Sequence, residues 1–132
     1  MTGKEREYFE ENIKNLYNND IDKRKIAIMN LGNFSHIAAV PYLIKALKER
    51  ELILYVISAL GKIKDQKSVG ALLNEFKTKN FLIQYKILNA LEKIGDKRVV
   101  PYLKTLTHND KIQDKNLFNK ALNCLNKLQH IN

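Results

Sequence analysis

Cysteine is almost absent from this sequence, and so is any segment that would direct the chain into or across a membrane. Cys124 is the only cysteine among the 132 residues, so no disulfide can form within the chain. The N-terminal stretch MTGKEREYFEENIKNLY has no uninterrupted apolar segment, which argues against a signal peptide. Apolar stretches elsewhere are interrupted by Lys, Glu or Gln well short of the roughly 20 residues that cross a bilayer. These absences predict a cytoplasmic protein that does not enter membranes.

Alternation of polar and apolar residues with a period of two is also absent, so we expect no β-strand. Apolar residues nevertheless make up 45% of the chain, which is too many for a disordered composition. A length of 132 residues is typical of one domain with a sizeable core, and we predict that domain over residues 1–132. The apolar residues recur at helical spacing, as in Val40, Leu43, Ile44 and Leu47, and again in Ile83, Ile87, Ala90, Leu91 and Ile94.

One unit is present three times in the sequence. Residues 31–47, 60–76 and 91–106 align without gaps and read LGNFSHIAAVPYLIKAL, LGKIKDQKSVGALLNEF and LEKIGDKRVVPYLKTL. A partial fourth copy at 117–128 aligns with 83–94, and the spacings are 29, 31 and 34 residues. Such repeats indicate a solenoid, in which stacked helix pairs bury the apolar faces that a single pair leaves open. We predict an all-α, right-handed α-solenoid of about four helix pairs, with repeats over roughly 4–34, 35–63, 64–94 and 95–130.

Polar turns separate the expected helices and carry residues suited to capping them. The expected N-caps inside the pairs are Asp20 or Asp22, Asn80 and Asp110. Between pairs, Gly95 ends one helix and Asp96 caps the next. The first helix is expected over about 4–17, with an apolar stripe of Phe9, Ile13 and Leu16 or Tyr17. Pro41 and Pro101 lie about five residues beyond the expected caps, which predicts a short kinked start to each following helix.

The stretches ALGKIKDQKSVGALL and ALEKIGDKRVVPYL resemble HEAT repeats, and are most similar to the short kind found in phycobilin lyase subunits. The resemblance covers about residues 5–130 and implies the helical solenoid, while such scaffolds serve many functions. Repeats of this kind often carry an arginine early in the second helix, which pairs with an aspartate of a neighbouring repeat. Here the corresponding residues are Arg24, Ile53, Gln84 and Phe118. We therefore expect no Asp–Arg ladder, and interpret Asp65 and Asp96 as helix caps.

Residues arranged for catalysis or metal binding are missing. His36 and His108 fall in turns, His130 lies near the C-terminus, and none belongs to the His-Glu pair of HEAT-type hydroxylases. Cys124 aligns with Ala59 and Ala90, which predicts a buried structural thiol. The glycines form no phosphate-binding loop, and the acidic stretch EREYFEE is expected on an exposed helix. Unlike DNA glycosylases built from HEAT-like repeats, the chain has no Trp and no candidate Asp in its groove. We expect no enzyme, no metal and no cofactor.

A concave face lined by the second helix of each pair is the expected binding surface. The repeat register places these partner-binding residues on it: Met29, Leu54, Tyr85, Asn89 and Asn123. The same register places Gly32, Gly61 and Glu92 on the side opposite the core. Exposed Leu and Tyr side chains in a groove suit a peptide or a helix. We therefore predict a non-enzymatic scaffold that presents this face to another protein.

The basic charge is concentrated in the C-terminal half. The net charge is +9, and residues 61–132 hold 14 Lys or Arg against 6 Asp or Glu. The register aligns five lysines in a basic stripe beside the groove: Lys62, Lys86, Lys93, Lys120 and Lys127. Such a stripe would guide an acidic partner or a nucleic-acid backbone, or it is a set of solubilising lysines on an exposed edge. Two alternatives remain, a nucleic-acid-binding module that uses this basic half, and a lyase-like or chaperone-like subunit of a larger complex.

Overall fold

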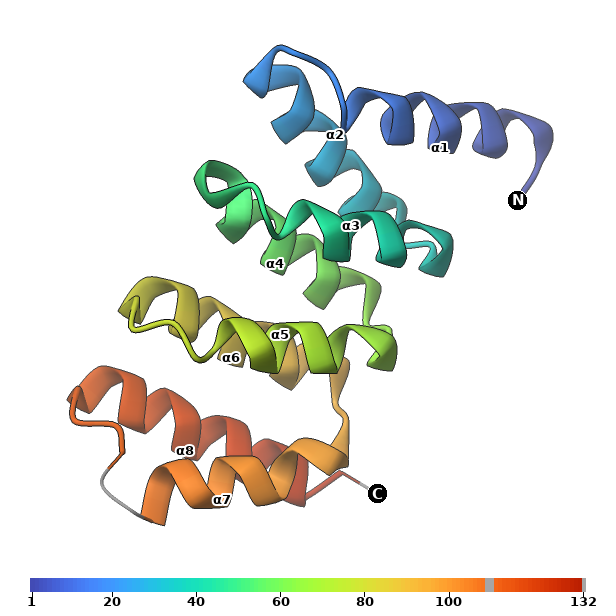
Figure 1. The fold of residues 1–132 in the computed structure, drawn as a ribbon. Helices are drawn as coiled ribbons and strands as arrows, with labels where there is room; N and C mark the ends of the chain where they lie inside the picture. The colour runs from blue at the N-terminus through green and yellow to red at the C-terminus, as the bar shows by residue number, and fades with distance from the viewer. Residues whose placement is uncertain (109–110, 132) are drawn as a thin grey trace.

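The chain folds into pairs of antiparallel helices that stack into a solenoid (Figure 1). The computed structural model describes residues 1–108 and 111–131, and these residues form eight α-helices and four short 3-10 helices but no strand. The first helices of the pairs are α1 (Gly3–Asn15), α3 (Val40–Ala46), α5 (Val69–Glu75) and α7 (Val100–His108). The second helices are α2 (Ile21–Phe34), α4 (Ile53–Ile63), α6 (Phe81–Ile94) and α8 (Lys115–Gln129). The predicted all-α solenoid of about four helix pairs is confirmed.

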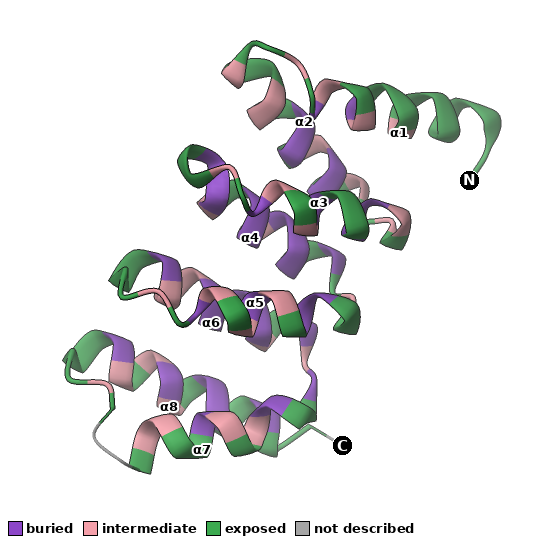
Figure 2. Cartoon of the chain, in the orientation of Figure 1, coloured by how far each residue is buried: buried purple, intermediate pink, exposed green. Residues whose placement is uncertain are grey.

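The second helices form the spine of the solenoid. They pack against one another in the order α2, α4, α6 and α8, while each first helix packs on the second helix of its own pair. The leucines that recur in the repeat are buried in this arrangement: Leu31, Leu43, Leu60, Leu72, Leu91 and Leu103. Figure 2 shows that the buried residues lie along the layer between first and second helices, whereas α1 at the N-terminal end is largely exposed.

Small residues bring neighbouring second helices close together. A Cβ atom added to Gly32 would lie 2.9 Å from the Cα of Ala59, and one added to Gly61 would lie 3.0 Å from the Cα of Ala90. Both glycines are buried in helix contacts, so their predicted place on the open face is wrong. Sequence periodicity identified the side opposite the pair's own core, but in a solenoid that side also borders the neighbouring second helix.

The turns between pairs repeat one local structure three times. Each preceding helix ends in a left-handed residue, with φ of 60° at Ser35, 62° at Lys64 and 71° at Gly95. The following residue then caps a 3-10 helix, at Ile37–Ala39, Gln66–Ser68 and Lys97–Val99. The α-helix starts directly afterwards, with Pro41 in the first turn of α3 and Pro101 as the second residue of α7. A 3-10 turn is present at each predicted kinked start, but the same turn precedes α5, which has Gly70 in place of the proline, so it does not depend on proline.

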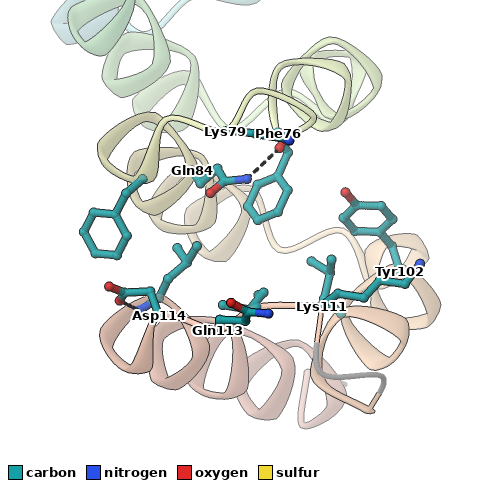
Figure 3. A pocket seen from close by; sticks show the side chains of 11 residues that line it. Phe76, Lys79, Gln84, Tyr102, Lys111, Gln113 and Asp114 are labelled. Carbon is teal, nitrogen blue, oxygen red and sulfur yellow. Dashed lines mark hydrogen bonds between the residues drawn. The ribbon is translucent and has the colours of Figure 1, made fainter.

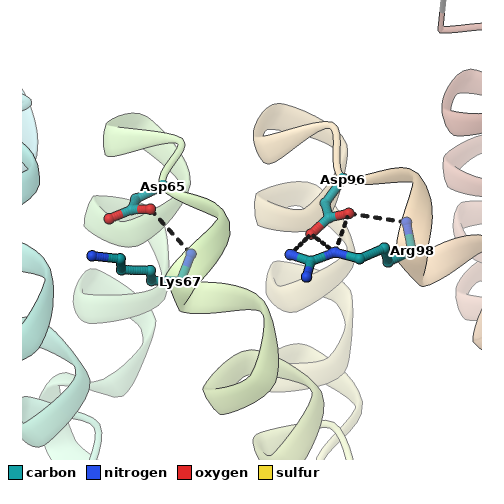
Figure 4. A network of polar contacts seen from close by, with 4 residues as sticks. All are labelled: Asp65, Lys67, Asp96 and Arg98. Carbon is teal, nitrogen blue, oxygen red and sulfur yellow. Dashed lines mark hydrogen bonds and ion pairs between the residues drawn. The ribbon is translucent and has the colours of Figure 1, made fainter.

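The caps of these turns are His36, Asp65 and Asp96. The Nδ1 atom of His36 accepts a hydrogen bond from the Ala38 N–H at 3.0 Å, and carboxylate oxygens of the two aspartates accept equivalent bonds at 3.1 and 2.9 Å. Figure 4 shows the two aspartates in matching positions, with Lys67 and Arg98 beside them. The interpretation of Asp65 and Asp96 as caps is confirmed, and His36 fills the same role.

Within the pairs, the predicted caps Asp20 and Asn80 precede α2 and α6. Asp110 lies outside the described residues, and the cap of α8 is Asp114, whose carboxylate accepts from the Leu117 N–H at 3.0 Å. The first helix begins at Gly3, where Thr2 and Glu5 form a reciprocal capping box, and it ends earlier than expected, at Asn15. A fourth 3-10 helix, Arg50–Leu52, leads into α4.

Candidate functional site

The exposed side of α2, α4, α6 and α8, here called the second-helix surface, carries the predicted partner-binding residues. Met29 on α2 is 43% exposed, and Asn123 on α8 is also exposed. Leu54 on α4, and Tyr85 and Asn89 on α6, are half-buried. Leu54 and Tyr85 pack partly against the core, so they present only part of their side chains to a partner.

The structure brings Tyr85 and Asn123 together at a hollow of about 420 Å³ between α6 and α8. Its α6 wall is apolar and includes Phe81 and Leu82, which are 39% and 50% exposed. The rings of Phe81 and Tyr85 lie 6.4 Å apart. Its α8 wall consists of three asparagines and one lysine, which are Asn116, Asn119, Asn123 and Lys120. Sequence reasoning missed Phe81 and Leu82, although two adjacent apolar residues directly after the cap Asn80 are a signal for such a surface.

The predicted basic stripe has internal partners at several of its lysines. Lys120 and Lys127 on α8 both lie 3.2 Å from carboxylate oxygens of Glu92 on α6. Only 10% of the Glu92 side chain is exposed, because it lies in the contact between these helices. The predicted position of Glu92 on the open face was therefore wrong, and its carboxylate offsets part of the positive charge of Lys120 and Lys127.

The remaining lysines of the stripe differ in their surroundings. Lys62 on α4 donates a hydrogen bond to Oδ1 of Asn33 on α2 at 2.9 Å. Lys86 and Lys93 on α6 lie with Asn89 around a shallow depression that reaches Ser58 and Gly61 on α4. In addition, the ammonium of Lys120 lies 5.4 Å from the ring centre of Tyr85, a cation–π distance. Lys120 of the stripe thus borders the apolar hollow directly.

Reactive side chains in the described part of the chain are engaged in structural contacts. Cys124 is buried, and burial together with the nearby Glu92 carboxylate raises its pKa to about 12, so the thiol stays protonated at neutral pH. Its predicted role as a buried structural thiol agrees with this environment. The Arg98 guanidinium forms hydrogen bonds of 3.0 and 2.6 Å with the two carboxylate oxygens of Asp96. These bonds hold the pKa of Asp96 below its ordinary value, despite its burial.

The histidines are spread along the solenoid and do not converge. His36 stacks near Phe34, with ring centres 6.2 Å apart, and Nδ1 of His108 lies 2.7 Å from the carbonyl oxygen of Lys104. Across residues 1–108 and 111–131, no three His, Cys, Asp or Glu side chains are grouped to hold a metal ion. None of the helices formed by these residues has the length and apolar character needed to cross a membrane.

A second hollow lies at the loop edge, which we define as the turns joining the two helices of each pair together with the adjoining helix ends. It measures about 580 Å³ and lies between the third and fourth pairs (Figure 3). Phe81 borders both this hollow and the one on the second-helix surface. The side-chain amide of Gln84 holds the rim by donating to the carbonyl oxygens of Phe76 and Thr78 at 3.0 and 2.8 Å. The C-terminal two pairs therefore carry adjoining hollows with apolar walls.

Comparison with known families agrees with this architecture. The model of HEAT repeats matches residues 48–123, and the model of the PBS lyase HEAT-like repeat matches residues 23–49. No curated protein matches the chain. The first match alone spans more than half of the sequence and includes α4 to α7, where two of the three repeated turns are found. The chain is therefore a helical repeat scaffold that belongs to the HEAT-repeat family.

Proposed function

We propose that the protein is a non-enzymatic scaffold that binds another protein on its second-helix surface. The observation that carries this proposal is the exposed apolar group at the hollow between α6 and α8. Phe81 and Leu82 are exposed, and both lie beside Tyr85 in the wall of one depression. Apolar and aromatic side chains around a depression, with amides and a lysine opposite, resemble the core and rim of a protein interface.

Burial of these side chains against a partner is a source of affinity. Removing an apolar side chain from water contributes roughly 25 cal/mol for each Å² that a partner covers. Aromatic residues that fill such depressions carry much of the binding energy in protein interfaces. The amides of Asn116, Asn119 and Asn123 can donate to and accept from a partner's main chain, which fixes orientation. We therefore expect a peptide or a helix that seats an apolar side chain between α6 and α8.

Affinity capture from an extract of the source cells tests this proposal. The variant Leu82→Asp with Tyr85→Ala is expected to lose a protein that the wild type retains, because it removes the apolar wall. The matched control is Tyr17→Ala with Tyr42→Ala, since these aromatic residues are exposed beside α1 and α3. Retention by the wild type and the control after nuclease treatment, with loss from the first variant, is the expected result. Equal retention by all three proteins would contradict the proposed surface.

Nucleic-acid binding is the second candidate, and one observation favours it. The described carboxylates of residues 61–131 are all engaged in hydrogen bonds or ion pairs, which leaves many lysines without an acidic neighbour. Nineteen lysines but only four arginines are present, however, and arginine is the residue better suited to bidentate phosphate contacts. Release of the captured material by nuclease would support this second candidate instead.

A further inference from the structure

Ion pairs connect successive turns along the loop edge. The Nε atom of Arg24 lies 3.0 Å from a carboxylate oxygen of Glu49, which links the first turn to the second. The Nη1 atom of Arg50 lies 2.9 Å from a carboxylate oxygen of Glu75, which links the second pair to the third. Both arginine side chains also donate hydrogen bonds to main-chain carbonyl oxygens of the turns. Arg24 donates to Asn18 and Asn19, and Arg50 donates to Leu47. These contacts form a short Arg–Glu ladder along the edge.

The ladder lacks its acid between the third and fourth pairs. The two ion pairs occupy different register positions, because Arg24 aligns with Ile53 and Gln84, but the spacings of 29 and 31 residues place Lys79 after Arg50 and Leu106 after Glu75. The third pair thus keeps a basic residue at its turn, while the fourth pair has an apolar residue where the carboxylate would stand. Lys79 makes no ion pair with any residue that the structure describes. The hollow of about 580 Å³ lies at this interrupted step.

The walls of this loop-edge hollow combine an apolar surface with two lysines. The apolar residues are Phe76, Phe81, Tyr102, Leu106, Ile112 and Leu117. Figure 3 shows Lys79 on the chain of the third pair and Lys111 on that of the fourth, both at the hollow. The one carboxylate in the lining, Asp114, accepts from the Leu117 N–H as the cap of α8. Its amide Gln84 is likewise committed to the main chain of the turn.

Negative charge for these two lysines is scarce in this half of the chain. Among the described residues after position 60, Asp65 and Asp96 cap turns, Glu75 pairs with Arg50, and Glu92 pairs with Lys120 and Lys127. The lining of the hollow thus has two lysines against one carboxylate, Asp114, and a carboxylate of another molecule can neutralise the excess positive charge. An apolar wall beside two cations is complementary to an acidic side chain that stands next to an apolar one, whereas a nucleic-acid backbone has no apolar group to fill the hollow.

We propose that a segment of the partner protein completes the ladder. An Asp or Glu of this segment pairs with Lys79 and Lys111, and an adjacent Leu, Ile or Phe enters the loop-edge hollow. This inference rests on the proposed protein-binding function, because Phe81 borders both hollows and one segment can cover the two. The partner is thereby assigned a chemistry, an acidic segment with an apolar anchor.

Selection of random peptides displayed against the immobilised protein tests this chemistry without a known partner. We expect the retained peptides to carry Asp or Glu next to Leu, Ile or Phe. One such peptide, labelled and followed by fluorescence anisotropy, is expected to bind Lys79→Glu with Lys111→Glu roughly tenfold more weakly, since two contacts become repulsive. The matched control, Lys97→Glu with Lys104→Glu, changes the same charge at two exposed lysines outside the hollow and is expected to bind within about twofold of wild type.

The outcomes separate this inference from the proposed function. Retained peptides without acidic residues, or equal weakening in both lysine variants, would overturn the acidic-segment inference. Binding that is nevertheless lost in Leu82→Ala would leave the second-helix surface in place as the binding site. A peptide that binds Leu82→Ala and Tyr85→Ala with the same affinity as the wild type would contradict the proposed function itself. Selection that retains no acidic peptide, together with binding of a single-stranded oligonucleotide that is lost in Lys79→Glu with Lys111→Glu, would overturn the inference in favour of nucleic acid.

Discussion

The left-handed residue that ends α4 should limit the stability of the chain. Lys64 has a φ of 62°, while Gly95 occupies the same place in the next turn with a φ of 71°. A side chain with a Cβ atom costs roughly 1–2 kcal/mol in this conformation, whereas glycine adopts it freely. Against this stands the greater freedom that glycine gives the unfolded chain, worth roughly 0.5–1 kcal/mol. We therefore expect Lys64→Gly to raise the free energy of unfolding by about 0.5–1 kcal/mol.

Urea denaturation followed by circular dichroism measures this gain. The midpoint should rise without a change in slope, because the buried surface stays the same. Lys64→Ala is the control, since it removes the same charge and side chain but keeps the Cβ atom. The main-chain hydrogen bond from the Lys64 N–H to the Leu60 carbonyl, at 3.2 Å, is retained in both variants. The reciprocal change Gly95→Ala introduces the strained Cβ and should lower stability by about 0.5–1 kcal/mol.

A result in which Lys64→Gly is no more stable than Lys64→Ala would refute the argument. It would mean that the left-handed conformation carries no strain at this turn, or that the turn does not form as described. A loss of stability in Lys64→Gly with a changed slope would point instead to a local opening between α4 and the following 3-10 helix.

Three further predictions address the core, the thiol and the stripe. Leu91 is 1% exposed, so Leu91→Ala should cost roughly 2–5 kcal/mol, and an unchanged denaturation midpoint would contradict its place in the core. The pKa of Cys124 is about 12 in the native chain, whereas an ordinary thiol has a pKa of roughly 8.5. At a pH between these two values the native chain keeps the thiol proton and the unfolded chain loses it. Stability should then fall as the pH rises from roughly 8.5 towards 12, and fall less in Cys124→Ala, as urea midpoints at several pH values will show. Lys86→Glu with Lys93→Glu should slow association with an acidic partner in stopped-flow measurements and weaken the salt dependence of the rate. The control is Lys45→Glu with Lys48→Glu. An equal effect from the control would mean that only the net charge of the protein matters, and not the position of the stripe.

Lys86 and Lys93 are the lysines of the stripe best suited to charge reversal. Reversal of Lys120 or Lys127 would place a second carboxylate beside Glu92, whose side chain is only 10% exposed. Such a variant is expected to lose stability, so a loss of binding would have two causes. That the five aligned lysines of the stripe take part in binding remains a prediction.

The helical architecture was predictable because its signals are local. The leucines recur at fixed spacing, the caps Asp20, Asn80 and Asp96 stand where helices begin, and Gly95 stands where one ends. The same local signals did not identify the left-handed Ser35 and Lys64, because neither residue type favours that conformation. Their alignment with Gly95 in the repeat was the available signal.

The candidate site was less predictable because it depends on contacts between repeats. Register identified Tyr85 and Asn123 as surface residues, but it could not show that Glu92 enters the contact with α8 or that Gly32 and Gly61 lie against alanines. The Arg–Glu ladder was missed for a similar reason. In the repeat family the arginine pairs with an aspartate of the motif, so no ladder was expected here, whereas the structure pairs Arg24 with Glu49 in a turn that varies between repeats.

The glycine contacts between second helices bear on how the solenoid could be lengthened. Gly32 meets Ala59 and Gly61 meets Ala90, whereas Glu92 and Cys124 stand at the corresponding positions of α6 and α8. The residue volume at this one register position limits how closely each pair follows the last, and thus the local curvature. An additional pair copied from residues 35–63 would continue the tight glycine-to-alanine spacing. A pair copied from the last repeat would carry no such glycine, so the curvature of an extended protein can be chosen by which unit is duplicated.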